Sequence, residues 1–552
     1  MPRRPKIWIE SAALFFGVAI VWLVAIASPG LARSDTLAAP AESDRAEGEA
    51  LQPPGAAGAG PRFRLSAVNI EGVTVYSGGE LLALYEPLLD QEIALDEIFA
   101  LADAVTARYR NDGYTLSRAI VPPQTIRAGR VRITVIEGFV DEVVIEGETR
   151  GRAGLFREWG EKIKASRPFN VAVLERYSLL ANDLPGARVR AVVRPSEDTP
   201  GAAEVVLAVE HKTFDASASL DNRAPKTTGP LQGVASVTGN SLLGLYDRTT
   251  LTYSSASERK HSQFFGLRHE QVLDAEGTVA SVAASYSRSQ PGDVLKDLDL
   301  ISESTTLGFE LTHPVIRSRD TNLTLAGGFT YREVDSDALS AKLFRDRLSV
   351  LTLGGAYRFT DPWRGLDFVD LRIHKGLDIL GASRSGDPFL TRGDGSGSFF
   401  KVTGSLSRTQ HLGDGMSLFL AATGQYASTQ LLASEEFGYG GPGFGRAYDP
   451  SEITGDHGVA VLAELRFTGR PDVPILNFYQ LYAFWDFGAT FDIDSGDQPA
   501  TRTGASAGAG VRFGVTDYAT GYIEVAKPMT RSVALEDNGN DARIFFRIST
   551  RF

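Results

Sequence analysis

The sequence predicts an exported membrane protein made of a signal peptide, two tandem βααββ domains and a C-terminal 16-stranded antiparallel transmembrane β-barrel. Three observations carry this prediction. The first 32 residues join positive charge to an apolar run, and residues 63–213 repeat one order of helices and strands. Residues 214–552 alternate apolar with polar or small residues and show no helical period.

Composition excludes several classes of function. The 552 residues contain 56 Lys and Arg against 68 Asp and Glu, a net charge of −12, so no overall positive field is available to hold a nucleic acid. The count of Cys is 0, which excludes thiolate catalysis, Cys-ligated metals and disulfides. The seven histidines are scattered without metal-ligand spacing, so we expect no cofactor, no metal and no enzyme activity.

The predicted signal peptide spans residues 1–32. Arg3, Arg4 and Lys6 precede an apolar run over residues 11–27, and small residues follow at positions 30 and 32. A permanent helical anchor over residues 12–28 is the alternative, because this run approaches the length that spans a bilayer. Residues 33–62 are rich in Ala, Gly, Glu and Pro and are predicted to be a linker, with a possible short helix over residues 41–52.

The first βααββ domain is predicted over residues 63–139. Its clearest element is a helix with one apolar face formed by Ile98, Leu101, Ala102, Val105 and Tyr109. The helix should stop at residues 111–113, and strands are predicted at residues 65–72, 118–121 and 130–137.

The second copy is predicted over residues 140–213, with helices at residues 153–165 and 171–182 and strands at residues 143–146, 189–194 and 204–210. The tripeptide Ile-Glu-Gly occurs at residues 70–72, 136–138 and 145–147. An exposed sheet edge in either domain could bind an extended chain by strand addition. The alternative is that the edges are blocked and the domains act only as spacers.

The barrel is predicted over residues 214–552 from about 16 alternating segments, roughly 21 residues for each strand and connection. For example, Leu307, Phe309 and Leu311 alternate with small or polar residues. Connections are unequal: short ones are expected at residues 273–276, 317–320, 361–365 and 411–413, and long ones at residues 290–302, 334–344, 377–395 and 429–455. This asymmetry and the terminal Phe552 are typical of barrels in the bacterial outer membrane, whose lipid would surround the apolar face.

Several motifs resemble those of the two-partner secretion transporters, the haemolysin and filamentous-haemagglutinin secretion/activation proteins. They lie at residues 109–114 (YRNDGY), 120–124 (IVPPQ), 135–138 (VIEG), 179–186 (LLANDLPG) and 376–382 (GLDILGA). The resemblance implies two periplasmic POTRA domains, a 16-stranded barrel, and a secreted partner protein with an N-terminal secretion domain. It also implies that the barrel assembly machinery inserts the protein.

The most specific likeness is a loop between the eleventh and twelfth predicted strands. The family has a V-R-G-Y/F tetrad there, at the tip of a loop that folds back into the lumen. This chain has Phe444 followed by Gly445-Arg446-Ala447-Tyr448, so the Arg and the aromatic residue are kept. The family pairs this Arg with an acid on the inner barrel wall, in a motif that matches Phe484, Asp486 and Gly488 of the run at residues 484–488.

Strand parity supports the inward position of Asp486 independently. Leu481, Ala483, Trp485 and Phe487 form the apolar face of this segment, so Asp486 should face the lumen. We therefore expect a bidentate ion pair between the Arg446 guanidinium and the Asp486 carboxylate. The alternative is a solvated Arg446 and a separate pore-lining Asp486.

The sequence Gly504-Ala505-Ser506-Ala507-Gly508 matches a nucleophile pattern, but no His follows it and no strand–turn–helix elbow is expected, so we predict a barrel strand of small residues.

The predicted function is translocation of an unfolded exported partner to the cell surface or medium, with the POTRA domains as its receptor. The alternative is an outer-membrane assembly factor or insertase, while a passive porin, a small-molecule receptor or an enzyme barrel is less well supported.

Overall fold

The computed structural model describes residues 61–552 except residues 200, 495, 497–498, 535 and 537–538. The predicted signal peptide and nearly all of the predicted linker lie outside these residues. The chain divides into two compact units, with the boundary between His211 and Lys212. Within the described residues, no helix is both long and apolar enough to cross a membrane.

The first domain of the N-terminal unit has the predicted order of elements and one extra small sheet. Strands β2, β5 and β4 form one sheet, and β1 pairs with β3 in the other. The bounds are β1 Arg62–Arg64, β2 Ala67–Glu71, α2 Gly78–Tyr85, β3 Glu92–Ala94, α3 Leu95–Asn111, β4 Arg118–Ile120 and β5 Arg130–Ile136.

Helix α3 buries the apolar face that its sequence predicts. Ile98, Leu101, Ala102, Val105 and Tyr109 are all buried, and they pack against the sheet. The carboxylate of Glu97 accepts a hydrogen bond from the Ala94 amide at 3.0 Å, which satisfies a free N–H at the start of the helix.

The second domain has a three-stranded sheet in the order β6, β8, β7, covered by helices α4 and α5. Its elements are β6 Phe139–Gly147, α4 Ala153–Ala165, α5 Val171–Asp183, β7 Ala187–Pro195 and β8 Ala202–His211. Strand β7 pairs with β8 on one side only, so its other edge is open among the described residues.

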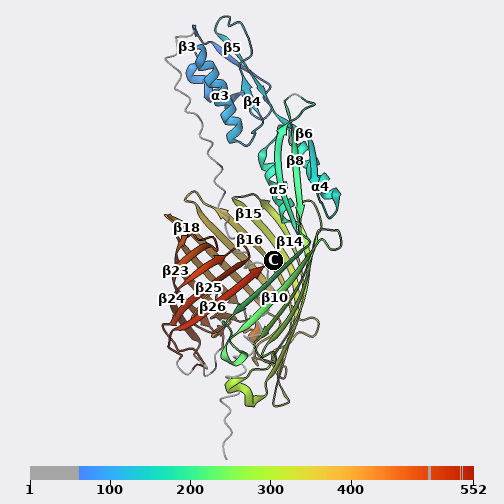
Figure 1. Cartoon of the computed structure of the whole chain (residues 1–552), viewed down its shortest axis with the longest axis vertical. Helices are drawn as coiled ribbons and strands as arrows, with labels where there is room; N and C mark the ends of the chain where they lie inside the picture. The colour runs from blue at the N-terminus through green and yellow to red at the C-terminus, as the bar shows by residue number, and fades with distance from the viewer. Residues whose placement is uncertain (1–60, 200, 495, 497–498, 535, 537–538) are drawn as a thin grey trace, which may run out of the picture. The chain divides into compact units, whose positions relative to one another are not determined.

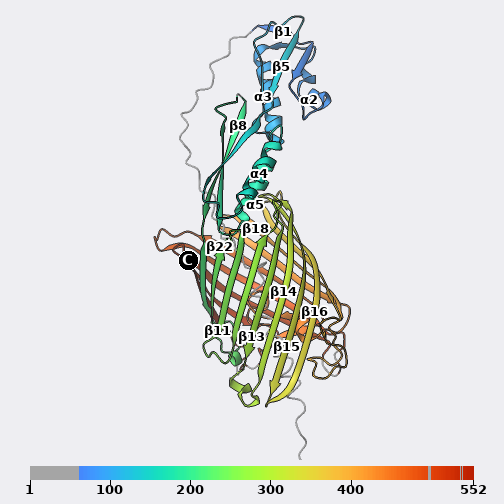
Figure 2. The same cartoon turned by 90° about the vertical axis from the view of Figure 1, so that its right-hand side faces the viewer.

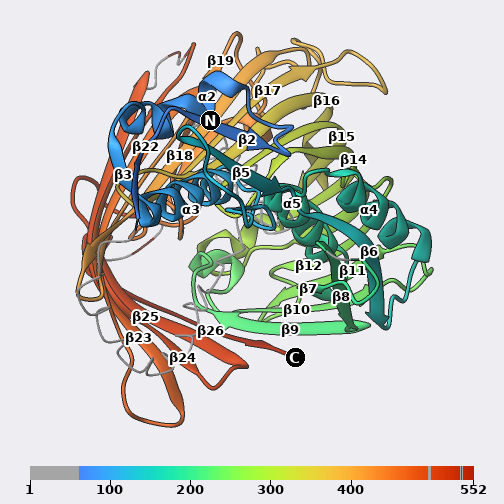
Figure 3. The ribbon, with the colours of Figure 1, turned by 90° about the horizontal axis from the view of Figure 1, so that it is seen from above.

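The C-terminal unit is a closed barrel of 16 strands in chain order, in which β26 pairs with β9 to close the ring (Figures 1–3). The strands are β9 Phe214–Asp221, β10 Gln232–Asn240, β11 Asp247–Ala256, β12 Gln263–Val272, β13 Val279–Ser289, β14 Ile301–Arg317, β15 Thr321–Ala338, β16 Ala341–Thr360, β17 Gly365–Gly376, β18 Phe400–Gly413, β19 Met416–Ala427, β22 His457–Gly469, β23 Leu476–Phe491, β24 Thr501–Val515, β25 Ala519–Pro528 and β26 Arg543–Arg551.

The predicted alternation sets the two faces of the wall. Leu307, Phe309 and Leu311 are exposed on the outside of the barrel, as the alternation predicts for side chains in contact with lipid. One predicted long connection is wrong: residues 334–344 are mostly strand, because β15 and β16 continue as a hairpin that turns at residues 339–340. Polar residues that pair across this hairpin gave it the composition of a loop.

Candidate functional site

The loop between β19 and β22 folds against the inner wall of the barrel. It contains two short paired strands, β20 Phe437–Tyr439 and β21 Ile453–Gly455, and its tip carries the predicted motif. At the tip Arg446, Ala447 and Tyr448 are buried, with exposed fractions of 6%, 0% and 2%. Ala447 packs in one cluster with inward-facing side chains of the wall, among them Leu462, Tyr482 and Phe484.

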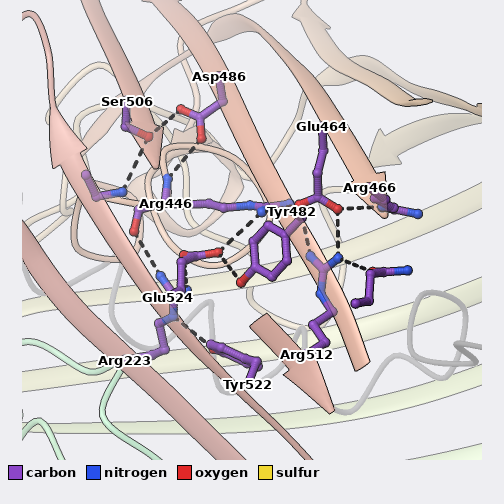
Figure 4. Close-up of polar contacts among 12 residues, drawn as sticks. Arg223, Arg446, Glu464, Arg466, Tyr482, Asp486, Ser506, Arg512, Tyr522 and Glu524 are labelled. Carbon is purple, nitrogen blue, oxygen red and sulfur yellow. Dashed lines mark hydrogen bonds and ion pairs between the residues drawn. The ribbon is translucent and has the colours of Figure 1, made fainter. Parts of the chain in front are cut away.

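Asp486 lies on the inner face of β23, as parity predicts: it is 0% exposed, whereas its neighbour Trp485 on the outer face is 49% exposed. Its carboxylate accepts three hydrogen bonds. Oδ1 accepts from the Tyr439 hydroxyl at 2.6 Å and the Ser506 hydroxyl at 2.7 Å. Oδ2 accepts from the backbone N–H of Arg446 at 3.2 Å (Figure 4). Asp486 therefore holds the backbone of the loop tip.

The predicted ion pair between the guanidinium of Arg446 and Asp486 is wrong. Arg446 Nη1 instead donates to Glu464 Oε2 at 2.5 Å and to Glu524 Oε2 at 3.3 Å. The register explains the difference, because Asp486 lies opposite Leu462, and Glu464 lies two residues further along β22. Two residues of strand correspond to about 7 Å, a distance that the long arginine side chain reaches from a backbone already bound to Asp486.

Glu464 is the centre of the charged network at the site. Its carboxylate accepts from Arg446, from Arg466 Nε at 2.6 Å, and from both terminal nitrogens of Arg512 at 2.8 and 2.9 Å. Its exposed fraction is 0%. Because three guanidinium groups share one buried carboxylate, removal of that carboxylate would leave them without their common partner.

Aromatic side chains complete the packing around Arg446. The guanidinium carbon lies 4.5 Å from the centre of the Phe484 ring, which is in the range of a cation–π contact. On the same face of β23, the Tyr482 hydroxyl donates to Glu524 Oε2 at 2.9 Å. The motif residue Phe484 thus supports the guanidinium group, while Asp486 binds the backbone.

Small residues on β23 and β24 make room for the loop. Gly488 and Gly504 are opposite each other in the ladder, and the ring of Tyr439 lies against both. A Cβ on Gly488 would lie 2.1 Å from Tyr439 Cδ2, and one on Gly504 would lie 2.6 Å from Cε1. A Cβ on Gly508 would meet the Phe484 ring at 2.7 Å. The run at residues 504–508 is therefore a barrel strand, as predicted, that receives the loop.

Comparison with known proteins identifies the family. The sequence profile of the haemolysin secretion/activation protein ShlB/FhaC/HecB matches residues 201–513, more than half of the chain. The chain belongs to this family. The POTRA domain of ShlB type matches residues 63–138, which are the first βααββ domain.

Curated relatives agree with this assignment. The heme/hemopexin transporter protein HuxB of Haemophilus influenzae is 23% identical over 82% of this chain and 81% of its own length, and a HuxB from another strain is 26% identical over 50% and 49%. The outer membrane transporter CdiB of Dickeya dadantii is 25% identical over 80% and 78%. The hemolysin transporter protein ShlB of Serratia marcescens is 25% identical over 71% and 70%.

Solved structures support the fold. CdiB from Escherichia coli superposes with a TM-score of 0.71 at 21% identity, covering 91% of this chain and 93% of that one. CdiB from Acinetobacter baumannii gives 0.64 at 15% identity over 100% of both chains. By its family match and its curated relatives, the chain is a two-partner secretion transporter of the outer membrane, with its POTRA domains in the periplasm.

The loop tip of this chain makes a backbone turn that requires glycine at the first position of the tetrad. Gly445 occupies the first position of the tetrad with a φ of +74°, a conformation that favours glycine. A Cβ there would lie 2.8 Å from the Cα of Gly440. The Tyr448 amide then donates to the Gly445 carbonyl at 2.8 Å, and the Tyr448 hydroxyl donates to the Ala505 carbonyl at 3.0 Å.

Sequence reasoning missed Tyr439, Glu464, Glu524 and Arg223 as members of this site. A signal existed for Glu464, because the alternation along β22 puts it on the same inward face as Leu462. No comparable signal existed for Tyr439, whose place depends on how the loop folds. Among the described residues, no group of three or more His, Asp or Glu side chains could hold a metal ion.

Proposed function

We propose that the POTRA domains of this transporter capture an unfolded secreted partner by strand addition, and that the partner passes through the barrel lumen when the loop carrying Arg446 moves. Transport of a partner protein is the property of the family. What we propose for this chain is that the partner is captured by strand addition, that it passes through the barrel lumen, and that the loop carrying Arg446 is the part that moves. The observation that carries it is the loop itself, whose tip is bound to the inner wall on the route through the lumen.

The wall of the lumen supports a polar path. Inward-facing Arg372 on β17 lies 3.1 Å from Asp370 and 3.7 Å from Glu310, and Arg268 on β12 lies 3.0 Å from Glu270. Because these charges are paired with one another, an extended chain can pass without meeting a wall of one sign. Paired charges in this position provide hydrogen-bonding groups and little net attraction.

The loop suits the role of a movable part because polar contacts, beside the packing of Ala447 and Tyr439, hold its tip. The guanidinium group of Arg446 at the tip contacts Glu464 on the wall, and neutral donors of the loop, the Arg446 amide and the Tyr439 hydroxyl, contact Asp486. Such contacts can be replaced by water when the lumen opens, whereas the neighbouring barrel ladders of β22, β23 and β24 continue over many residues and stay closed.

The open edge of β7 supports strand addition. The strand is nine residues long, unpaired on one side, and carries the half-exposed apolar side chain of Val192. Proteins block such edges with lysine, so Val192→Lys should weaken capture and lower secretion of the partner. The matched control is Phe99→Lys on α3, because Phe99 is exposed to the same extent, 48% against 47%, and lies on no sheet edge.

The test measures the secreted partner in the medium after co-expression with each variant. Deletion of residues 63–213 should abolish secretion while the barrel remains folded. Equal secretion by Val192→Lys and the wild type would exclude this edge as the receptor, and export by the deletion variant would exclude the POTRA domains altogether. Lipid around the apolar belt and insertion by the barrel assembly machinery belong to the same proposal and are tested by the folded fraction of barrel in outer-membrane extracts.

A further inference from the structure

The closing seam of the barrel is short. The ladder between β9 and β26 has five pairs, from Ser217 opposite Arg551 to Asp221 opposite Arg547, whereas the next shortest ladders among the described barrel strands contain eight pairs. Backbone hydrogen bonds between Ala216 and Phe552, and from the Asn222 amide to the Phe546 carbonyl at 3.4 Å, extend the seam by one residue at each end. Strand β9 ends at Asp221. Strand β26 begins at Arg543, four residues before Arg547, which is its first residue paired with β9. The first four residues of β26 therefore lie beyond the β9 ladder.

Three consecutive side chains reinforce the end of the ladder and bind the part of β26 that lies beyond it. Asp221 accepts from Arg547 Nη2 at 2.7 Å across the seam. Asn222 continues the pairing with its amide group, because Oδ1 accepts from the Phe546 amide at 2.8 Å and Nδ2 donates to the Ile544 carbonyl at 2.9 Å. Arg223 then turns into the lumen. We call residues 221–223 the seam clasp.

Arg223 donates three hydrogen bonds, one to the loop tip and two to strand β25. Its Nη1 donates to the backbone carbonyl of Arg446 at 2.8 Å, its Nη2 to Glu524 Oε1 at 2.5 Å, and its Nε to the Tyr522 hydroxyl at 3.0 Å (Figure 4). The guanidinium carbon also lies 3.9 Å from the centre of the Phe545 ring on β26. The side chain is only 7% exposed.

We propose that Arg223 is a positioning residue that ties the loop tip to the closing seam, so that the tip leaves the wall more often when this link is lost. This inference rests on the proposed role of the loop as the moving part. The physical basis is that one rigid fork bridges the loop backbone, strand β25 and the end of β9. Glu524 strengthens the link, because it also accepts from the Arg446 guanidinium at 3.3 Å.

The test uses a single reporter thiol in the full-length protein purified in detergent. Because the chain contains no cysteine, Ala447→Cys introduces one thiol at the fully buried loop tip. Its rate of reaction with a maleimide measures how often the tip leaves the wall. Adding Arg223→Gln should raise this rate by about tenfold or more, because loss of a charged hydrogen bond shifts a local opening equilibrium by about that factor.

Two controls separate coupling from general loosening. Arg551→Gln makes the same substitution at the opposite end of the same seam, where Arg551 is 79% exposed and lies 3.9 Å from Asp215, and it should leave the tip protected. A second reporter, Ser281→Cys on the inner face of β13, should stay protected in the Arg223→Gln background, since Ser281 is buried on a strand four positions around the barrel from β9.

The outcomes decide the inference directly. The inference is overturned if the tip thiol reacts as slowly in Arg223→Gln as in its parent. It is also overturned if Arg551→Gln raises the rate of the tip thiol as much as Arg223→Gln does, or if Arg223→Gln exposes the Ser281→Cys thiol together with the tip thiol. If Arg223→Gln does not fold, as judged by gel mobility before heating, Arg223→Lys decides, because it keeps a charge for Glu524 but loses the fork and should give an intermediate rate. No partner protein is used, so failure here leaves the secretion proposal to its own assay.

Discussion

The assignment of the Arg446 side chain to Glu464 can be tested by comparing two double-mutant cycles. Arg446→Ala is combined in turn with Glu464→Gln and with Asp486→Asn. The two acids are both fully buried, and both bind the loop tip. They differ in what they bind, since Glu464 contacts the guanidinium and Asp486 contacts the backbone N–H.

The magnitudes follow from these contacts. A buried hydrogen bond between charged groups contributes about 1.5–3 kcal/mol, so the interaction free energy between Arg446 and Glu464 should be about 2 kcal/mol. Arg446→Ala keeps the backbone N–H that binds Asp486, so that coupling should stay below about 0.5 kcal/mol. The Glu464→Gln single variant should lose about 3–5 kcal/mol, because it also leaves Arg466 and Arg512 without their carboxylate.

The assay is guanidinium-induced unfolding of the detergent-solubilised protein, followed by tryptophan fluorescence and by the mobility of the folded barrel on unheated gels. The free energy of unfolding is obtained for the wild type, the three single variants and the two double variants. A coupling between Arg446 and Asp486 equal to or larger than that between Arg446 and Glu464 would refute the reasoning and restore the pair expected from the sequence.

Three further predictions concern the contact between the loop and the barrel wall and the first POTRA domain. Gly488→Ala should displace Tyr439 and cost about 1–3 kcal/mol of barrel stability, whereas Gly443→Ala in the same loop, where a Cβ meets nothing within 4 Å, should be neutral; protease resistance of the loop distinguishes them. Tyr439→Phe should cost about 1–3 kcal/mol, because the buried Asp486 loses one donor, while Tyr426→Phe, at a 63% exposed side chain, should have little effect on the same unfolding curve. In the first POTRA domain, burial opposes ionisation of Glu137, but hydrogen bonds from Thr74 and Tyr109 outweigh it and lower the pKa of this carboxyl. Because the folded-state pKa is lowered, the ionised Glu137 stabilises the domain at any pH above the ordinary carboxyl pKa, and this stabilisation is lost as the pH falls through the folded-state pKa. The protease resistance of residues 61–138 should therefore fall in acid, and Glu137→Gln should flatten that pH dependence. A steeper dependence in Glu137→Gln would contradict this account.

The sequence by itself determined the faces and the order of the elements. Alternation along a strand has a period of two, so the inward position of Asp486 and the outward position of Trp485 followed from the residues without knowledge of any neighbour. In the same way, the apolar spacing from Ile98 to Tyr109 predicted the buried face of α3. These features are local, and chain periodicity is enough to specify them.

Only the tertiary structure decided which charges meet. Register between strands places Glu464 two residues beyond the partner of Asp486, and a pattern within one strand holds no information about that offset. The place of Arg223 depends on the closure of β26 onto β9, which joins residues more than 300 positions apart. A long arginine side chain has several acids within reach of its backbone position, and the packing of the loop against the wall selects among them.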